Sequence, residues 1–179
     1  MSICASFVAG GDSDTVKSVR DIFDFSIKED FARTFVFSLC EIPNQTVQFG
    51  SSQLIPNYRI MPEAWKNFIG TWVGYFPKRM KPSTLQKELE AGYRKLTSWK
   101  RIGKNLMKCR PYKALSIWHY RNSAMPSIKV MKDNMEFLRS FEDDYYTEDE
   151  TLIEEKLKHD YEKKQGVFDP AYAKKFAVN

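Results

Sequence analysis

The side chains that most often perform chemistry in proteins are few and scattered in this sequence. Neither the two histidines nor the three cysteines fall at the spacings of metal ligands, and no phosphate-binding or metalloprotease motif occurs. Cys109 precedes Arg110, a cation of the kind that activates a nucleophilic thiol, but no partner base is identifiable. The sequence therefore predicts a protein that is not an enzyme, uses no cofactor and has no identified small-molecule substrate.

Four basic residues at seven-residue intervals form the most regular polar pattern in the chain. Seven residues are nearly two turns of an α-helix, so in one continuous helix these side chains would form a ridge along one side. A basic ridge predicts a surface that binds an anion or an acidic partner. The four residues are Lys87, Arg94, Arg101 and Lys108.

A single helix over residues 83–109 would position this ridge. Ser83 and Gln86 have the spacing of a capping box, and Pro111 would end the helix. Gly92 and Gly103 would let another element approach closely. Apolar residues recur at intervals of three and four, so the helix is predicted to dock through one face and carry charge on another. The apolar residues are Leu85, Leu89, Tyr93, Leu96, Trp99, Ile102, Leu106 and Met107.

An aromatic stretch that ends in a basic cluster precedes this helix. Pro62 suits the first position of a helix, and Pro77 would end it, so residues 62–76 are predicted to be helical. Aromatic residues beside a basic cluster are typical of a membrane surface, although the same pattern fits a buried amphipathic helix. The residues predicted to dock on a membrane surface or a partner are Trp65, Phe68, Trp72, Phe76, Lys78, Arg79 and Lys81.

Charge is strongly segregated along the chain. The net charge is +5, but residues 78–121 hold thirteen basic and only two acidic side chains. This segment therefore carries +11 and the rest of the chain −6. The imbalance predicts an anionic partner, which could be RNA, lipid headgroups or an acidic protein surface. The alternative is that the acidic C-terminal third folds back onto the basic middle.

The fold class predicted for all 179 residues is mostly α, an irregular helical domain with a long central amphipathic helix and extended connectors and termini. Residues 1–61 would hold N-terminal helices and a connector, 62–121 the basic aromatic core, and 122–179 acidic helices. A strand over 34–42 competes with the helix expected at 27–41. The other expected helices cover residues 16–23, 111–121, 128–141 and 148–165.

The three widely spaced cysteines suggest no disulfide framework and favour an intracellular, reducing compartment. No secretory signal is visible, and no apolar run reaches the about 20 residues that span a bilayer. Within the basic helix, the sequence Gly92-Tyr93-Arg94 resembles the Leu-Tyr-Arg signature of small mitochondrial complex subunits in two residues. The leading Leu is replaced by Gly, and the position is mid-chain rather than N-terminal. The resemblance implies a mitochondrial setting.

These patterns together predict a non-catalytic accessory subunit of a large multiprotein assembly. The predicted setting is a mitochondrial inner-membrane complex of the respiratory-chain or ATP-synthase type. Its partners would be other protein subunits, with anionic lipid headgroups nearby. Two alternatives fit the same charges: an RNA-binding protein of a ribosome-like particle, and a viral matrix-like protein that bridges membrane and nucleoprotein.

Overall fold

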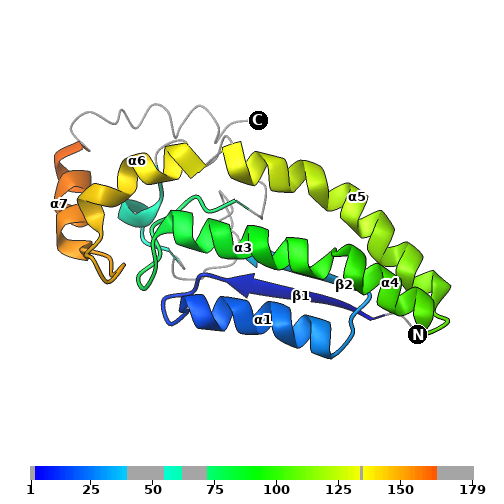
Figure 1. Ribbon diagram of the computed structural model, residues 1–179. Coiled ribbons are helices and arrows are strands. Elements are labelled where there is room, and N and C mark those ends of the chain that lie inside the picture. Colours follow the sequence, from blue (N-terminus) through cyan, green and yellow to red (C-terminus); the bar gives the residue numbers. More distant parts are fainter. Residues whose placement is uncertain (1–2, 40–54, 62–71, 134, 165–179) are drawn as a thin grey trace, which may run out of the picture.

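The computed structural model describes residues 3–39, 55–61, 72–133 and 135–164, and this part of the chain is mostly helical, as predicted (Figure 1). A small parallel sheet of two strands lies beside the helices. The strands are β1 (Cys4–Ala9) and β2 (Arg33–Ser38), and the short 3-10 helix η1 covers Asn57–Arg59. The helices are α1 (Val16–Lys28), α3 (Pro82–Leu96), α4 (Trp99–Met107), α5 (Pro111–Asp133), α6 (Met135–Tyr145) and α7 (Glu154–Lys164).

The N-terminal part is a β-α-β unit rather than two helices. The helix predicted over 27–41 is wrong, and the competing strand is observed over Arg33–Ser38. A turn at Asp30, whose φ is +57°, ends the helical path before this strand. In β2 the side chains of Thr34 and Val36 are buried and that of Phe35 is exposed, the alternation of a half-buried strand. Parallel strands need a crossover connection, and α1 provides it.

In the loop between β1 and α1, the side chain of Asp14 satisfies two backbone N–H groups. The Asp14 carboxylate accepts the N–H groups of Gly10 and Gly11, each at 2.8 Å. Thr15 then caps α1 and forms a capping box with Ser18. The backbone donors that a phosphate would need in this loop are therefore already occupied.

The single helix predicted over 83–109 is divided at Thr97. The Thr97 hydroxyl donates to the Tyr93 carbonyl at 2.8 Å, and the Arg101 guanidinium donates to the Leu96 carbonyl at 2.9 Å. These two bonds satisfy carbonyl groups at the C-terminus of α3, and Ser98 then starts α4 as its N-cap. The apolar face of α3 is buried as predicted, and α3 packs against α1, α5 and α6.

The C-terminal half differs from prediction at two further places. The predicted helix boundary at Pro126 is wrong, because α5 runs through it and buries Ala124 and Ile128 on either side. Packing there outweighs the lost backbone hydrogen bond. After α5, Glu142 is only 4% exposed, and Tyr145 and Tyr146 are buried as well. The predicted helix over 148–165 begins later, at Glu154.

The acidic C-terminal part, as far as it is described up to residue 164, folds back onto one end of the basic middle. Glu142 accepts hydrogen bonds from Ser83, and Glu150 accepts one from the Thr84 hydroxyl at 2.9 Å. Both contacts lie at the start of α3. Figure 1 shows α7 and α4 at opposite ends of the fold. The described acidic helices therefore do not neutralise α4.

Candidate docking surface

A helical hairpin made by α4 and α5 positions the candidate site (Figure 1). The turn is tight: the Cys109 N–H donates to the Leu106 carbonyl at 3.0 Å, and the Arg110 N–H donates to the Asn105 carbonyl at 2.9 Å. Cys109 adopts a left-handed conformation with φ +54°. Pro111 follows and opens α5, a position where its missing N–H costs nothing. Sequence and geometry therefore fix where the two helices meet.

An apolar groove of about 560 Å³ lies along the hairpin. Its inner wall belongs to a small buried cluster of Ile102, Ala114 and Ile117, which is separate from the main core. Its outer walls are side chains that water reaches: Leu106 is 56% exposed and Leu115 is 58% exposed. A contiguous apolar surface of this kind is typical of an interaction site. The lining residues are Ile102, Leu106, Pro111, Tyr112, Ala114, Leu115 and Trp118.

Positive charge lies on the other side of α4 from the groove. Lys100, Lys104 and the C-cap residue Lys108 recur every fourth residue and are exposed, two residues out of step with Ile102 and Leu106 and so about half a turn away from them. No salt bridge joins these three lysines to an acidic residue in the described part of the chain. Residues 91–132 contain eleven Lys and Arg and no Asp or Glu. Within the described residues, the hairpin thus carries an apolar groove on one side of α4 and a row of unpaired lysines on the other.

The basic residues on the inner side of the hairpin are neutralised from outside it. The Asp30 carboxylate lies 2.6 Å from Lys113 and 3.0 Å from Arg110. Partial burial alone would raise the pKa of Asp30, but these cations outweigh it and hold that pKa below its ordinary value. This pairing attaches the hairpin to the end of α1 and leaves the row on α4 unpaired.

The four cations of the predicted ridge do not form one exposed row. Lys87 and Lys108 are exposed, and Arg94 pairs with Glu90 one turn away at 2.9 Å. Arg101 is buried, and its guanidinium donates to the carbonyl groups of Leu96 and Phe31. The break at Thr97 changes the helical register, so Arg101 turns inward. The ridge prediction therefore failed at its third position.

The predicted membrane-surface segment is only partly described. Residues 62–71 of the helix predicted over 62–76, including Trp65 and Phe68, lie outside the described residues. The part that follows is not helical, because Tyr75 forms a β-bridge with Ile60. Trp72 is half-buried and Phe76 is 2% exposed. Of the basic residues, Arg79 is exposed, whereas Lys78 and Lys81 are half-buried.

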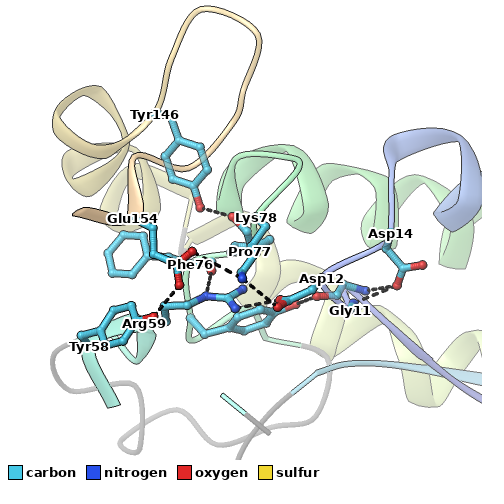
Figure 2. A network of polar contacts seen from close by, with 12 residues as sticks. Gly11, Asp12, Asp14, Tyr58, Arg59, Phe76, Pro77, Lys78, Tyr146 and Glu154 are labelled. Atoms are coloured by element: carbon cyan, nitrogen blue, oxygen red, sulfur yellow. Dashed lines mark hydrogen bonds and ion pairs between the residues drawn. The ribbon is translucent and has the colours of Figure 1, made fainter. Parts of the chain in front are cut away.

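Lys78 belongs to a polar network that links the loop containing Asp12 to α7 (Figure 2). The Asp12 carboxylate lies 2.7 Å from the buried Arg59 guanidinium and 3.3 Å from Lys78. Lys78 also lies 3.4 Å from Glu154, whose carboxylate accepts the Tyr58 hydroxyl. Arg59 donates in addition to the Phe76 carbonyl at 2.9 Å. The network joins distant segments of the fold and does not form an exposed binding face.

Both carboxylates of this network have lowered pKa values. Partial burial would raise the pKa of Asp12, but the hydrogen bonds and charges of Arg59 and Lys78 outweigh burial and lower it. For Glu154, the Tyr58 hydroxyl contributes most to lowering the pKa, and Lys78 adds to the effect against burial. The ionised forms of both groups therefore stabilise the fold.

The sequence prediction placed a helix over 111–121 but identified no groove on it. In the structure Ile117 is fully buried, whereas Leu115 and Trp118 are exposed. The sequence held a sign of this exposed face, because the large apolar residues of α5 are distributed around the whole helix rather than along one side. A helix of that kind must bury a second face somewhere.

Comparison with models of protein families, with curated proteins and with solved structures found no match to this chain. In the described residues, no helix combines the length and hydrophobicity needed to cross a membrane. The same residues contain no group of three or more His, Cys, Asp or Glu side chains arranged to hold a metal ion.

Proposed function

We propose that this protein is a non-catalytic accessory subunit that docks onto another protein of a larger assembly through the α4–α5 groove. The observation that carries the proposal is the open apolar groove, whose large apolar side chains water reaches. An exposed apolar groove is costly in water unless a partner covers it. Filling it with partner side chains would bury Leu106, Leu115 and Trp118. Of these, tryptophan is a residue type that often dominates binding energy at interfaces.

The setting expected for this assembly is a mitochondrial inner-membrane complex, and fractionation of the producing cells tests that part of the proposal separately. The resemblance at residues 92–94 has a second explanation in the fold. Tyr93 is 4% exposed, and its hydroxyl bonds the backbone of Val36. Its place in the sequence is therefore explained by packing, whatever the compartment.

The test is the native size of the full-length protein in cells that produce it. Wild-type protein should migrate in a complex much larger than 21.0 kDa, and Leu115→Arg should release it as free chain. Leu115 is 58% exposed, so the substitution leaves the core intact. Val8→Arg is the matched control, because Val8 is also 58% exposed but lies on β1. It should stay in the complex.

Two results would overturn the proposal. One is wild-type protein that migrates as a free chain under gentle extraction. The other is a complex that collapses on RNase treatment and is unaffected by Leu115→Arg, since this would favour the RNA-binding alternative.

A further inference from the structure

Strand β1 has one edge that the fold leaves open. The Ala9 carbonyl accepts the Leu39 N–H at 2.8 Å, so the backbone groups of Ala9 point toward β2. Backbone groups point to the two sides of a strand in alternation, so those of Cys4, Ser6 and Val8 point away from β2. Within the described part of the chain, no hydrogen bond reaches the backbone groups of these three residues. The outer edge of β1 is therefore available to pair with another strand.

The outer edge of β2, in contrast, is closed by tyrosine side chains. The Tyr93 hydroxyl bonds both the N–H and the C=O of Val36, and the Tyr120 hydroxyl donates to the Thr34 carbonyl. The sequence of β1, Cys-Ala-Ser-Phe-Val-Ala, holds no charged residue and no proline. Such residues are the ones that usually keep an edge strand from pairing with another chain. An edge that lacks them favours the addition of a strand.

We propose that β1 pairs antiparallel with β1 of a second copy of this chain, around a two-fold axis at Ser6. In this register Ser6 faces Ser6 of the second copy, and Cys4 faces Val8 of the second copy. Residues that face each other at alternate positions of an antiparallel ladder exchange both of their hydrogen bonds. Every outward N–H and C=O group of Cys4, Ser6 and Val8 therefore finds a partner. The two-fold axis makes the contact closed, so pairing stops at the dimer.

The side chains along this edge suit self-pairing. Those of Cys4, Ser6 and Val8 are exposed, small and uncharged, so no like charges face each other across the axis. On the α1 side, Phe25 packs against Phe7 of β1 with ring centroids 6.3 Å apart, yet Phe25 remains 47% exposed. A strand added beside β1 would cover part of this ring and remove apolar area from water. The hydrogen bonds of the edge are thus accompanied by an apolar contribution.

The chemistry of the edge selects an extended polypeptide over other partners. A row of backbone N–H and C=O groups at strand spacing is matched by the backbone of another strand, whereas a helix has its interior backbone groups bonded internally. A second copy of the chain supplies a strand whose free groups match those of β1 position by position. An extended segment of a different protein is the competing occupant, and the mass of the purified protein separates the two.

The dimer goes beyond the proposed docking function and does not depend on it, because the edge of β1 and the α4–α5 groove are formed by different residues. Leu115→Arg should leave the dimer intact, and Ser6→Lys should leave the protein in its native complex. Val8→Arg keeps the backbone groups of the edge and faces Cys4 of the second copy rather than another Arg, so it should keep both contacts. Failure of the dimer and failure of the docking function are therefore distinguishable.

The first measurement is the mass of the purified full-length protein by analytical ultracentrifugation. We expect 2 × 21.0 = 42.0 kDa at about 200 µM and dissociation on dilution, because an interface of small area is weak. Ser6→Lys should raise the dissociation constant about fivefold, since it places two like charges opposite each other. Ser13→Lys is the matched control at an exposed loop serine and should change the constant less than about twofold. Wild-type protein that is monomeric at about 200 µM, or equal effects of the two substitutions, would overturn the inference.

The second measurement is a disulfide that reports the register. Residues that form a hydrogen-bonded antiparallel pair have Cα atoms about 5.5 Å apart, a distance that a disulfide spans. Cys4 is free and exposed, so oxidation of the Val8→Cys variant with diamide should link position 8 to Cys4 of the second copy, as located by mass spectrometry of the linked peptides. Ser13→Cys is the control and should link far more slowly. Equal linkage of the two variants, or linked peptides that mainly join other cysteines, would rule out the antiparallel pair at Ser6.

Discussion

The carboxylate of Glu142 on α6 caps the start of α3 through Ser83, a residue 59 positions away in the chain. One oxygen accepts the Ser83 backbone N–H, and the other accepts the Ser83 hydroxyl at 2.8 Å. The first N–H groups of a helix have no partner within it, and the helix dipole favours a negative charge at that end. A tertiary contact therefore does what a local cap usually does.

Replacing Glu142 with Ala should lower the free energy of unfolding by about 2–3 kcal/mol, because it leaves the buried N–H and hydroxyl of Ser83 unbonded. Urea denaturation measures this change. Asp143→Ala is the control, since Asp143 is exposed, and it should change stability by less than about 0.5 kcal/mol. Equal effects of the two substitutions would show that the cap contributes nothing.

The sequence predicted the apolar face of α3 correctly but misassigned its cap. Ser83 and Gln86 have capping-box spacing, yet Gln86 accepts the Val73 backbone N–H at 3.1 Å and Ser83 bonds Glu142. Periodicity predicts which face of a helix is apolar, because that face is set by the spacing of residues close in the sequence. Which distant group reaches a helix end depends on the tertiary fold, so local spacing could not reveal Glu142.

Gly92 and Gly103 should respond oppositely to replacement by Ala. A Cβ at Gly92 would lie 2.3 Å from the Phe23 ring of α1, a distance at which the helices must move apart. Gly92→Ala should therefore cost about 1–3 kcal/mol. A Cβ at Gly103 meets nothing within 4 Å, so Gly103→Ala should stabilise the protein by about 0.5–1 kcal/mol through helix propensity.

Thermal unfolding of the two glycine variants side by side checks this prediction. The comparison is matched, because both are Gly-to-Ala changes inside helices. A stabilising Gly92→Ala would mean that α1 and α3 are not in close contact at Phe23.

The Tyr93 hydroxyl bonds the backbone of β2, and its loss should lower the stability of the protein. The hydroxyl accepts the Val36 N–H at 2.9 Å and donates to the Val36 carbonyl at 2.8 Å. Tyr93→Phe should lower the free energy of unfolding by about 1–3 kcal/mol, because both backbone groups are buried. Tyr112→Phe is the control, since Tyr112 is 88% exposed, and it should leave stability unchanged in the same urea experiment.

Only one of the two features of the α4–α5 hairpin, its positive charge, could be predicted from the sequence. The absence of acidic residues over 91–132 can be read directly and predicts an uncompensated basic surface. The groove cannot be read in the same way, because it depends on how α4 turns away from α3 at Thr97 and meets α5. The break requires Arg101 to bond the Leu96 carbonyl, a role that its place in a seven-residue repeat gives no reason to expect.

The lowered pKa values of Asp12, Asp30 and Glu154 predict that stability falls in acid. A carboxyl with a lowered pKa in the folded state stabilises the protein above its ordinary pKa. That contribution is lost as pH falls through the folded value, because the unfolded chain then binds more protons. Denaturant titrations should show the loss between about pH 5 and pH 2.

The contribution of Asp12 can be isolated with Asp12→Asn. At pH 7 this substitution should cost about 1 kcal/mol, a modest value because the Asp12 side chain is 50% exposed although Arg59 is buried. The difference from wild type should shrink as the pH falls toward 2, because the wild-type carboxyl becomes protonated over that range. Asp149→Asn serves as an exposed control and should show little difference at either pH. A cost of Asp12→Asn that stays constant from pH 7 to pH 2 would rule out the ionised Asp12–Arg59 pair as its source.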